Sequence, residues 1–440
     1  MSWSVDMAPL TEPAFARLRS VDPVLAEAAG DAAFELETDL FAALAKGIME
    51  KGASDAFPFA WASLAAQIGE VSPERVLEAG SALEAFGKKT ANALLGAAKA
   101  VRSGKIGMER LAALPDDEAV GALCSLRCVD VRLAVRVLIG VLRRPDVLRF
   151  DDEAVRSGLM RVHGPRSCTQ EGFEAFRARH APFGSAATLC LWESEERLRP
   201  VFPCGGEALD ALKRRDKRLG RVIERLGPIR RGVEPDLFTA LVDSVIAQQI
   251  SGRAAQTISD RLHVLVGNFT PQGLAEADPS QIQQCGLSQR KVGYIQGIAR
   301  EVASGALDLE ALRHAPDEEL IRKLSALNGI GVWTAEMLMI FSLCRPDVLS
   351  WGDLGIRRGM ALLYGDRELT RERFERRRKR YSPYGSVVSL YLWSIAGMEE
   401  GLGGKAPQRL MRCALRRTGT GLAWGTCLEL FRVSSPRPVV

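Results

Sequence analysis

The sequence lacks an uninterrupted apolar run close to the roughly 18 residues that a membrane-spanning helix needs. Hydrophobic residues nevertheless make up 47% of its 440 residues, enough to build sizeable buried cores. Residues 1–14 lack the basic start and apolar centre of a secretory signal, so we expect none. These absences argue against a membrane or secreted protein and favour a cytoplasmic one. The length of 440 residues predicts two or three domains.

Metal-binding patterns are also missing. The nine cysteines are scattered and odd in number, and Cys124 and Cys128 form a close pair without a second pair to complete it. No Cys/His cluster has zinc spacing, and no run of four cysteines indicates an iron–sulfur cluster. We therefore expect free thiols in a reducing cytoplasm, no cofactor and no metal dependence.

Positive charge is concentrated at one end of the chain. Residues 401–440 carry seven Lys or Arg against the single acid Glu429, while the whole chain has a net charge of +5, so the other 400 residues sum to about −1. This basic tail is interpreted as a solvated, partly disordered end, with salt-dependent affinity for DNA as the alternative. Residues 371–380 are a second basic cluster, typical of a charged helix face or of phosphate contacts.

The chain contains an internal repeat with a shift of 201 residues. Residues 103–192 align with 304–393 without a gap, and 35 of these 90 positions are identical. The pentapeptide RPDVL, for example, occurs at 144–148 and again at 345–349. A repeat of this length indicates a duplicated domain rather than a solenoid unit. The boundary is predicted between Glu193 and Glu207, where prolines and glycines gather.

Hydrophobic periodicity predicts helices throughout. Segments such as Gln281–Ser304 and Asp317–Leu327 place apolar residues at three- and four-residue spacing, and strand-like alternation is rare. The prediction is an all-α protein with two tandem helical domains of about 190 residues, each made of two lobes. The domains are expected at residues 1–200 and 207–400, followed by the tail at 401–440.

The most informative motif is a short run with two glycines, Leu327–Ala335. Gly329 and Gly331 bracket Ile330 between two apolar helical stretches, and Asp353 follows 22 residues after Gly331. Glycines permit a tight turn whose backbone N–H groups, together with the start of the next helix, can hold a phosphate. Ile330 is expected to pack between the two helices. The alternative is an ordinary helix–turn–helix with glycines at a C-cap.

These motifs carry a family resemblance. Residues 208–398 resemble the HhH-GPD superfamily of DNA glycosylases, and within it the 3-methyladenine (AlkA-like) branch. Residues 329–335 match the family's DNA-binding hairpin, and Asp353 falls on its catalytic aspartate. Residues 244–251 are similar to the helix whose end inserts a residue into the DNA stack. Residues 383–386, which precede Trp393 in the sequence, resemble a late helix with a base-stacking tryptophan.

The resemblance implies a set of site residues. Asp353 is expected to be catalytic. The base pocket is expected to include Trp333, Trp393, Met337 and Tyr384, the hairpin contacts to involve Asn328, Gly329, Ile330, Gly331 and Thr334, and the wedge that fills the gap in the DNA to involve Gln249, Gln248 and Ser251. In relatives a monovalent cation sits on hairpin carbonyls, which here would be those of Leu327 and Ile330. The expected partner is double-stranded DNA with damaged bases, bound by a monomer associated with the nucleoid.

The first copy of the repeat departs from this pattern. It keeps Asp152 at the position of Asp353, but it replaces both hairpin glycines and the wedge residues; the changes are Gly329-Ile330-Gly331 to Cys128-Val129-Asp130, Trp333 to Arg132, and Gln248-Gln249 to Lys51-Gly52. A carboxylate at the hairpin tip is expected to repel DNA. We therefore predict a degenerate, non-catalytic domain in which Asp152 persists as a helix cap.

The expected chemistry is hydrolysis of alkylated purines such as 3-methyladenine or 7-methylguanine. Such bases carry positive charge, which a tryptophan face attracts, and they leave without an added proton, so the single carboxylate of Asp353 suffices. Bifunctional relatives have a lysine nucleophile where this chain has Trp333, so no strand cleavage is expected. The alternatives are a silent damage-binding protein or a glycosylase for hypoxanthine or uracil. Met337, where an aromatic residue is usual, leaves the substrate range open.

Overall fold

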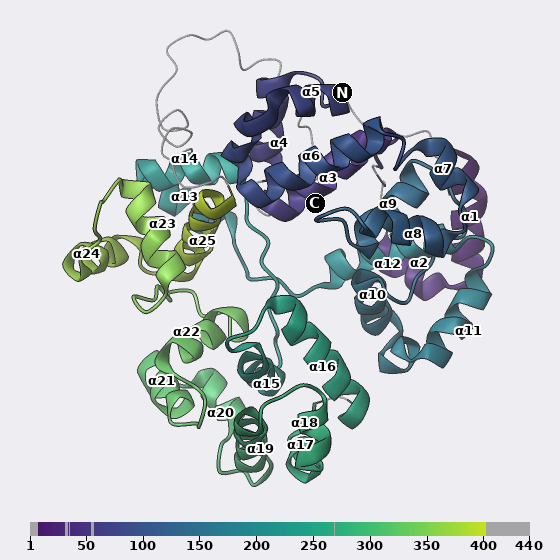
Figure 1. Ribbon diagram of the computed structural model, residues 1–440. Coiled ribbons are helices and arrows are strands. Elements are labelled where there is room, and N and C mark those ends of the chain that lie inside the picture. Colours follow the sequence, from purple (N-terminus) through teal and green to yellow (C-terminus); the bar gives the residue numbers. More distant parts are fainter. Residues whose placement is uncertain (1–7, 31–33, 35, 54–56, 268, 402–440) are drawn as a thin grey trace, which may run out of the picture. The chain divides into compact units, whose positions relative to one another are not determined.

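The computed structural model describes residues 8–30, 34, 36–53, 57–267 and 269–401 (Figure 1). The predicted basic tail lies outside the described residues from position 402 onward. The described chain divides into two compact units. One comprises the described residues up to Leu198 together with Gly397–Gly401, and the other comprises Arg199–Ala396. The first change from one unit to the other lies between Leu198 and Arg199. This position falls inside the segment 193–207 in which the domain boundary is predicted.

The first unit is helical. Its helices are α1 (Ala8–Val21), α2 (Pro23–Ala29), α3 (Leu40–Ala53), α4 (Phe57–Ile68), α5 (Pro73–Ala79), the 3₁₀ helix η2 (Gly80–Phe86), α6 (Lys88–Arg102), α7 (Met108–Ala113), α8 (Asp116–Cys124), α9 (Val131–Gly140), α10 (Glu153–His163), η3 (Pro165–Cys168), α11 (Gln170–His180) and α12 (Gly184–Leu198). Helices α3–α6 pack with α8 and α9, while α1, α2 and α10–α12 form a second group.

The second unit repeats this plan. Its helices are α13 (Gly206–Arg215), α14 (Lys217–Leu226), α15 (Leu237–Ala247), α16 (Gly252–Val266), α17 (Pro271–Glu276), α18 (Pro279–Gln284), α19 (Gln289–Ala303), α20 (Leu309–His314), α21 (Asp317–Ser325), α22 (Val332–Phe341), α23 (Leu354–Tyr364), α24 (Arg371–Tyr381) and α25 (Gly385–Gly401). Within the described residues the only β-type pairing is an isolated bridge between Val201 and Gly232. The all-α prediction is confirmed.

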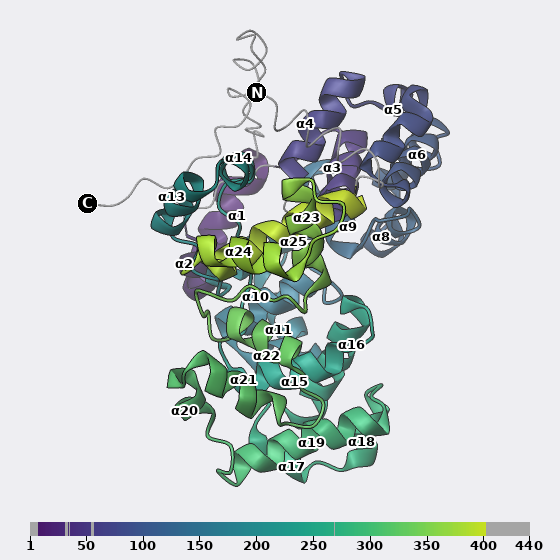
Figure 2. The ribbon, with the colours of Figure 1, turned by 90° about the vertical axis from the view of Figure 1, so that its left-hand side faces the viewer.

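Two lobes are visible within the second unit. Helices α15–α22 lie together in both views, and α13, α14 and α23–α25 lie together as a second group (Figures 1 and 2). The first lobe carries the hairpin between α21 and α22, and the second carries the start of α23. The chain that links α22 to α23 therefore passes from one lobe to the other, and a site at these two helix starts draws on both.

The segment 281–304, predicted from its periodicity to be helical, contains a turn. Residues 281–304 form two helices, α18 and α19, separated by a turn. Gly286 in this turn has a φ of 112°, a conformation that favours glycine. Ser288 then caps α19, because its side chain accepts a hydrogen bond from the N–H of Lys291. Both helices bury apolar residues, Ile282 in α18 and Val292, Ile295 and Ile298 in α19.

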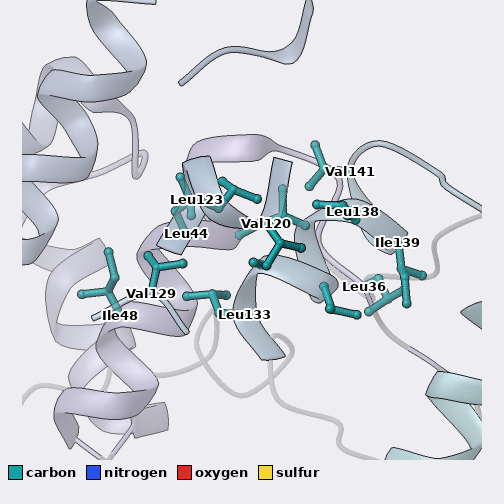
Figure 3. Close-up of a cluster of buried hydrophobic side chains, with 14 of the residues drawn as sticks. Leu36, Leu44, Ile48, Val120, Leu123, Val129, Leu133, Leu138, Ile139 and Val141 are labelled. Atoms are coloured by element: carbon teal, nitrogen blue, oxygen red, sulfur yellow. The ribbon is translucent and has the colours of Figure 1, made fainter. Parts of the chain in front are cut away.

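The first unit has an extensive apolar core of its own. Figure 3 shows part of it, where Leu44 and Ile48 of α3 lie near Val120 and Leu123 of α8 and Leu133 of α9. These five side chains are at most 4% exposed. Burial of each such side chain is worth roughly 1.5–3 kcal/mol, so the loss of the hairpin glycines from this copy has not cost it a packed interior.

Identical contacts recur in the two units at the 201-residue spacing. The hydroxyl of Ser185 donates to the carbonyl of Arg144 at 2.6 Å, and that of Ser386 donates to the carbonyl of Arg345 at 2.5 Å. Each hydroxyl also accepts a backbone N–H at 2.9 Å, from Val147 and Val348 respectively. The sequence repeat is therefore accompanied by a repeat of local geometry.

Each unit also buries one aspartate at the start of its second helix. In the second unit Asp216, 4% exposed, accepts hydrogen bonds from the hydroxyls of Tyr364 and Tyr381 and from Arg380. Burial opposes ionisation, but the hydrogen bonds outweigh it, so the pKa of Asp216 lies below its usual range. The matching residues of the first unit are Asp22, His163 and His180. The buried aspartate is therefore contacted by two tyrosine hydroxyls in the second unit and by two histidine rings in the first.

Candidate active site

The candidate site centres on Asp353, the residue that precedes α23. Its side chain is 6% exposed and caps the helix, because Oδ1 accepts the N–H of Ile356 at 2.7 Å. Two indoles also point their N–H groups at the carboxylate. Trp393 donates to Oδ1 at 2.9 Å, and Trp333 donates to Oδ2 at 2.9 Å. Three donors from three helices therefore fix the orientation of this one carboxylate.

These contacts leave the two oxygens unequal. Oδ1 accepts two hydrogen bonds and Oδ2 one, whereas a carboxylate oxygen has two lone-pair sites. Oδ2 is therefore the oxygen with capacity for a further donor or for a positive centre. Gly355 makes the arrangement possible: a Cβ there would lie 2.8 Å from Cδ1 of Trp393, so any larger residue would push the indole away from Oδ1.

The two tryptophans differ in accessibility. Trp333 stands in the first turn of α22 and is 49% exposed. Trp393 is half-buried, and its ring stacks on Phe341 with centroids 5.5 Å apart. One side of the Trp393 ring system thus has a partner already, while Trp333 offers more free aromatic surface to a ligand. Leu354, 69% exposed, adds apolar surface in the residue after Asp353.

The hairpin between α21 and α22 has the geometry that its glycines predict. Gly329 has a φ of 91°, and a Cβ there would lie 2.4 Å from the ring of Tyr294. Gly331 caps α22 in an extended conformation, and a Cβ there would meet nothing within 4 Å. Gly329 is therefore required by the fold, whereas the absence of a side chain at Gly331 leaves open space at a helix N-terminus, which favours an anion.

The remaining hairpin residues divide into exposed and buried ones. Ile330 is 4% exposed, as expected for a residue packed between the helices, and Asn328 is exposed. Thr334 is buried, so its predicted contact with DNA has no support in this geometry. The carbonyl of Leu327 accepts the N–H of Ile330 at 3.1 Å and keeps a second lone pair; the cation on these carbonyls stays a prediction.

The segment predicted to enter the DNA follows α15. Gln249 is exposed and has a φ of 60°, which is unusual for a residue with a side chain. Strain of this kind often marks a functional position. Gln248 is half-buried, and its Nε2 donates to the carbonyl of Gly329 at 2.7 Å. Ser251 caps α16 by accepting the N–H of Ala254. A hydrogen bond from the side chain of Gln248 to the carbonyl of Gly329 thus joins the wedge segment to the hairpin.

Two predicted pocket residues are less closely tied to the site. Met337 is half-buried on α22, one turn after Trp333. Tyr384 precedes α25 and lies under the guanidinium of Arg215, 5.4 Å from the ring centroid. Trp393 lies nine positions later in a largely helical stretch, roughly 13 Å away at 1.5 Å per residue. Its assignment to the pocket has no support in the contacts of the described residues.

Three residues that support the candidate site were not predicted from the sequence. Lys291 of α19 donates to the carbonyls of Ile246 and Gln248, at 2.8 and 2.7 Å. Tyr294 supports the hairpin, and Phe341 stacks on Trp393. The only sequence signal for Lys291 is its position in the first turn of a capped helix, which does not reveal its partners. These roles depend on contacts between helices that the sequence does not display.

A family model described as HhH-GPD superfamily base excision DNA repair protein matches residues 242–383. DNA-3-methyladenine glycosylase 1 of Schizosaccharomyces pombe is 30% identical over 197 residues, which cover 44% of this chain and 86% of that protein. The chain belongs to the HhH-GPD superfamily. DNA-3-methyladenine glycosylase of Saccharomyces cerevisiae is 34% identical over 198 residues, covering 37% of this chain and 67% of the relative.

Among solved structures, the DNA-3-methyladenine glycosidase of Bacillus halodurans is 39% identical, with a TM-score of 0.42 over 45% of this chain and 92% of that one. The matched HhH-GPD segment contains Gln249, the hairpin and Asp353, all in the second unit. Within the described ranges, no group of three His, Cys, Asp or Glu side chains is arranged to hold a metal ion. No described helix is long and apolar enough to cross a membrane.

The segment of the first unit that aligns with the hairpin has different residues and contacts. Cys128, at the position of Gly329, keeps a positive φ of 63°. Asp130 caps α9 by accepting the N–H of Leu133 at 3.0 Å and forms an ion pair with Lys51. Burial opposes its ionisation, but the bonds from Lys51 and Leu133 lower its pKa below the usual range. A carboxylate of the chain itself therefore occupies the helix N-terminus that a phosphate would need.

The carboxylate of Asp152 also differs from that of Asp353. Both carboxylates cap a helix, so capping is not the difference between them. Oδ1 of Asp152 accepts the N–H of Ala154 at 2.9 Å, and Oδ2 accepts the indole N–H of Trp192 at 3.0 Å. Ala154 stands where the other unit has Gly355. Arg132 lies over Trp192 at 5.4 Å and lowers the pKa of Asp152, but burial is the larger effect and raises it overall.

Proposed function

We propose that this chain is a DNA glycosylase of base excision repair that hydrolyses the N-glycosidic bond of alkylated purines, of the 3-methyladenine and 7-methylguanine type. The observation that carries the proposal is Asp353, a buried carboxylate held by two indole N–H groups, whose Oδ2 accepts only one hydrogen bond and keeps a second acceptor site. The relatives named DNA-3-methyladenine glycosylase support the substrate class. The expected partner is damaged duplex DNA, bound by a cytoplasmic monomer.

The proposed reaction begins with extrusion of the damaged nucleotide, because its glycosidic bond is not reachable inside the duplex. Gln249 fills the vacated space, and Gly331 with the start of α22 holds a phosphate. The positively charged base lies against exposed Trp333, where a desolvated cation gains on the order of 2 kcal/mol. The second unit alone supplies these elements, and the first unit is proposed to be non-catalytic.

Bond cleavage then sends the glycosidic electron pair to the base nitrogen, which neutralises its charge, and leaves an oxocarbenium-like sugar. Oδ2 of Asp353, which keeps one acceptor site beside the N–H of Trp333, stabilises this positive centre. A water attacks the sugar carbon and gives its proton to Oδ2, from which the proton passes to solvent. The products are free base and an abasic site.

The test is release of methylated purines from alkylated duplex DNA, measured by chromatography of the free bases. We expect release of 3-methyladenine and 7-methylguanine and no covalent adduct after borohydride treatment, because Trp333 occupies the position at which bifunctional relatives carry a lysine. Release of hypoxanthine or uracil alone would replace the proposed substrate class. Binding of DNA without release of any base would leave a damage-binding protein instead.

A further inference from the structure

Lys291 makes a contact that the proposed reaction does not yet explain. It lies on α19 with its side chain directed at the end of α15, and its ammonium donates to the carbonyls of Ile246 and Gln248 at 2.8 and 2.7 Å. The last carbonyls of a helix lack partners within the helix and favour a cation. Lys291 of α19 therefore caps the C-terminal end of α15, next to the segment that contains the predicted wedge residue Gln249.

The contact acts on the peptide group next to the strained residue. The carbonyl of Gln248 belongs to the planar peptide that joins Gln248 to Gln249, so fixing its direction restricts the φ of Gln249. That φ is 60°, in the left-handed region that a residue with a side chain rarely adopts. The Gln248 side chain holds the same peptide from its other end by donating to the carbonyl of Gly329.

The first unit offers an internal comparison. Thr90 stands at the position of Lys291, and Gly52 at that of Gln249. A Cβ on Gly52 would lie 2.4 Å from the hydroxyl of Thr90, so that position has no room for a side chain. Helix α3 also continues to Ala53, past the point at which α15 has ended. The first unit, which lacks the hairpin glycines, therefore lacks both a lysine at the position of Lys291 and a side chain at the position of Gln249.

We propose that Lys291 is a positioning residue that holds the 248–249 peptide so that Gln249 projects into the DNA stack. The inference rests on the proposed glycosylase function. It assigns Lys291 to extrusion of the base and not to cleavage of the bond, since no described contact links Lys291 to Asp353. Its loss should therefore matter when the lesion must be pulled out of a base pair, and matter little when the lesion is already unpaired.

The experiment compares Lys291→Met with Arg290→Met, an exposed neighbour whose loss changes the net charge equally. Single-turnover release of 7-methylguanine is measured from a duplex with the lesion opposite cytosine and from one with the lesion opposite an abasic-site analogue. We expect Lys291→Met to slow release from the paired lesion about tenfold or more, the value of a charged hydrogen bond. On the unpaired lesion the loss should be less than about threefold, again judged against that scale.

Arg290→Met should behave as the wild type on both substrates, and Lys291→Arg should recover most of the rate on the paired lesion, because it restores a cationic donor. Equal losses on paired and unpaired lesions, or a paired-lesion rate equal to that of Arg290→Met, would overturn the proposal. Thermal unfolding of each variant identifies any general loss of fold. If the wild type releases the base from neither duplex, the glycosylase function fails rather than the role of Lys291.

Discussion

Asp353→Asn removes the charge of the proposed catalytic carboxylate while keeping its shape. A unit charge about 4 Å from the sugar cation contributes about 4 kcal/mol at an effective dielectric constant near 20. Losing it should slow single-turnover excision by about three powers of ten. The remaining amide oxygen still accepts from Ile356 and Trp393, as Oδ1 does now, while the amide NH₂ faces the N–H of Trp333.

The structural cost of this substitution is small. The lost hydrogen bond is worth about 1 kcal/mol, and half-exposed Trp333 can turn its N–H to water, so Tm should fall by no more than about 2–4 °C. Asp152→Asn is the matched control, an identical change at the equivalent position of the first unit, and excision should be unaffected. Excision by folded Asp353→Asn at more than a tenth of the wild-type rate would refute the reasoning, as would an equal loss in Asp152→Asn.

Two further predictions concern stability. Gly329→Ala places a methyl group against Tyr294 at a φ of 91° and should lower the free energy of unfolding by about 1–3 kcal/mol. Gly331→Ala has open space for its methyl group, so it should cost about 1 kcal/mol or less and mainly weaken duplex binding. A larger loss of stability in Gly331→Ala than in Gly329→Ala would contradict the hairpin geometry. The lowered pKa of Asp216 means that its ionised form stabilises the fold above about pH 4 and that this contribution is lost as the pH falls through the native value. Acid unfolding of the wild type should therefore be steeper than that of Asp216→Asn, and parallel curves would reject this account.

Local features of the site were predictable from the sequence because they are encoded in short segments. The two glycines of the hairpin lie in a turn of a few residues, and the 22-residue spacing from Gly331 to Asp353 covers one helix, α22, and the loop that follows it. The repeat exposed the two-unit plan, since corresponding residues align without a gap over 90 positions. The helical class followed from periodicity for the same reason: the signal is complete within each segment.

Contacts between distant helices could not be predicted. The ammonium of Lys291 meets carbonyls 43 and 45 residues away only because α19 packs against α15. The two indoles reach the oxygens of Asp353 across 20 and 40 residues. The pocket role of Tyr384 stays a prediction, because among the described residues the contact of its ring is with Arg215 rather than with Asp353 or the two tryptophans.

The ion pair between Lys51 and Asp130 bears on the evolution of the first unit. Both side chains are at least 39% exposed, so the pair is worth about 0–1 kcal/mol, and replacing a capping aspartate by glycine costs a few tenths more. The interactions that hold the Asp130 carboxylate at the start of α9 are therefore weak. A single substitution of Asp130 would leave the ammonium of Lys51 available to bind a phosphate. The free-energy cost of changing Asp130 is therefore small. A site like that of the second unit would also need changes at Arg132 and Gly52, the positions of Trp333 and Gln249, which one substitution does not supply.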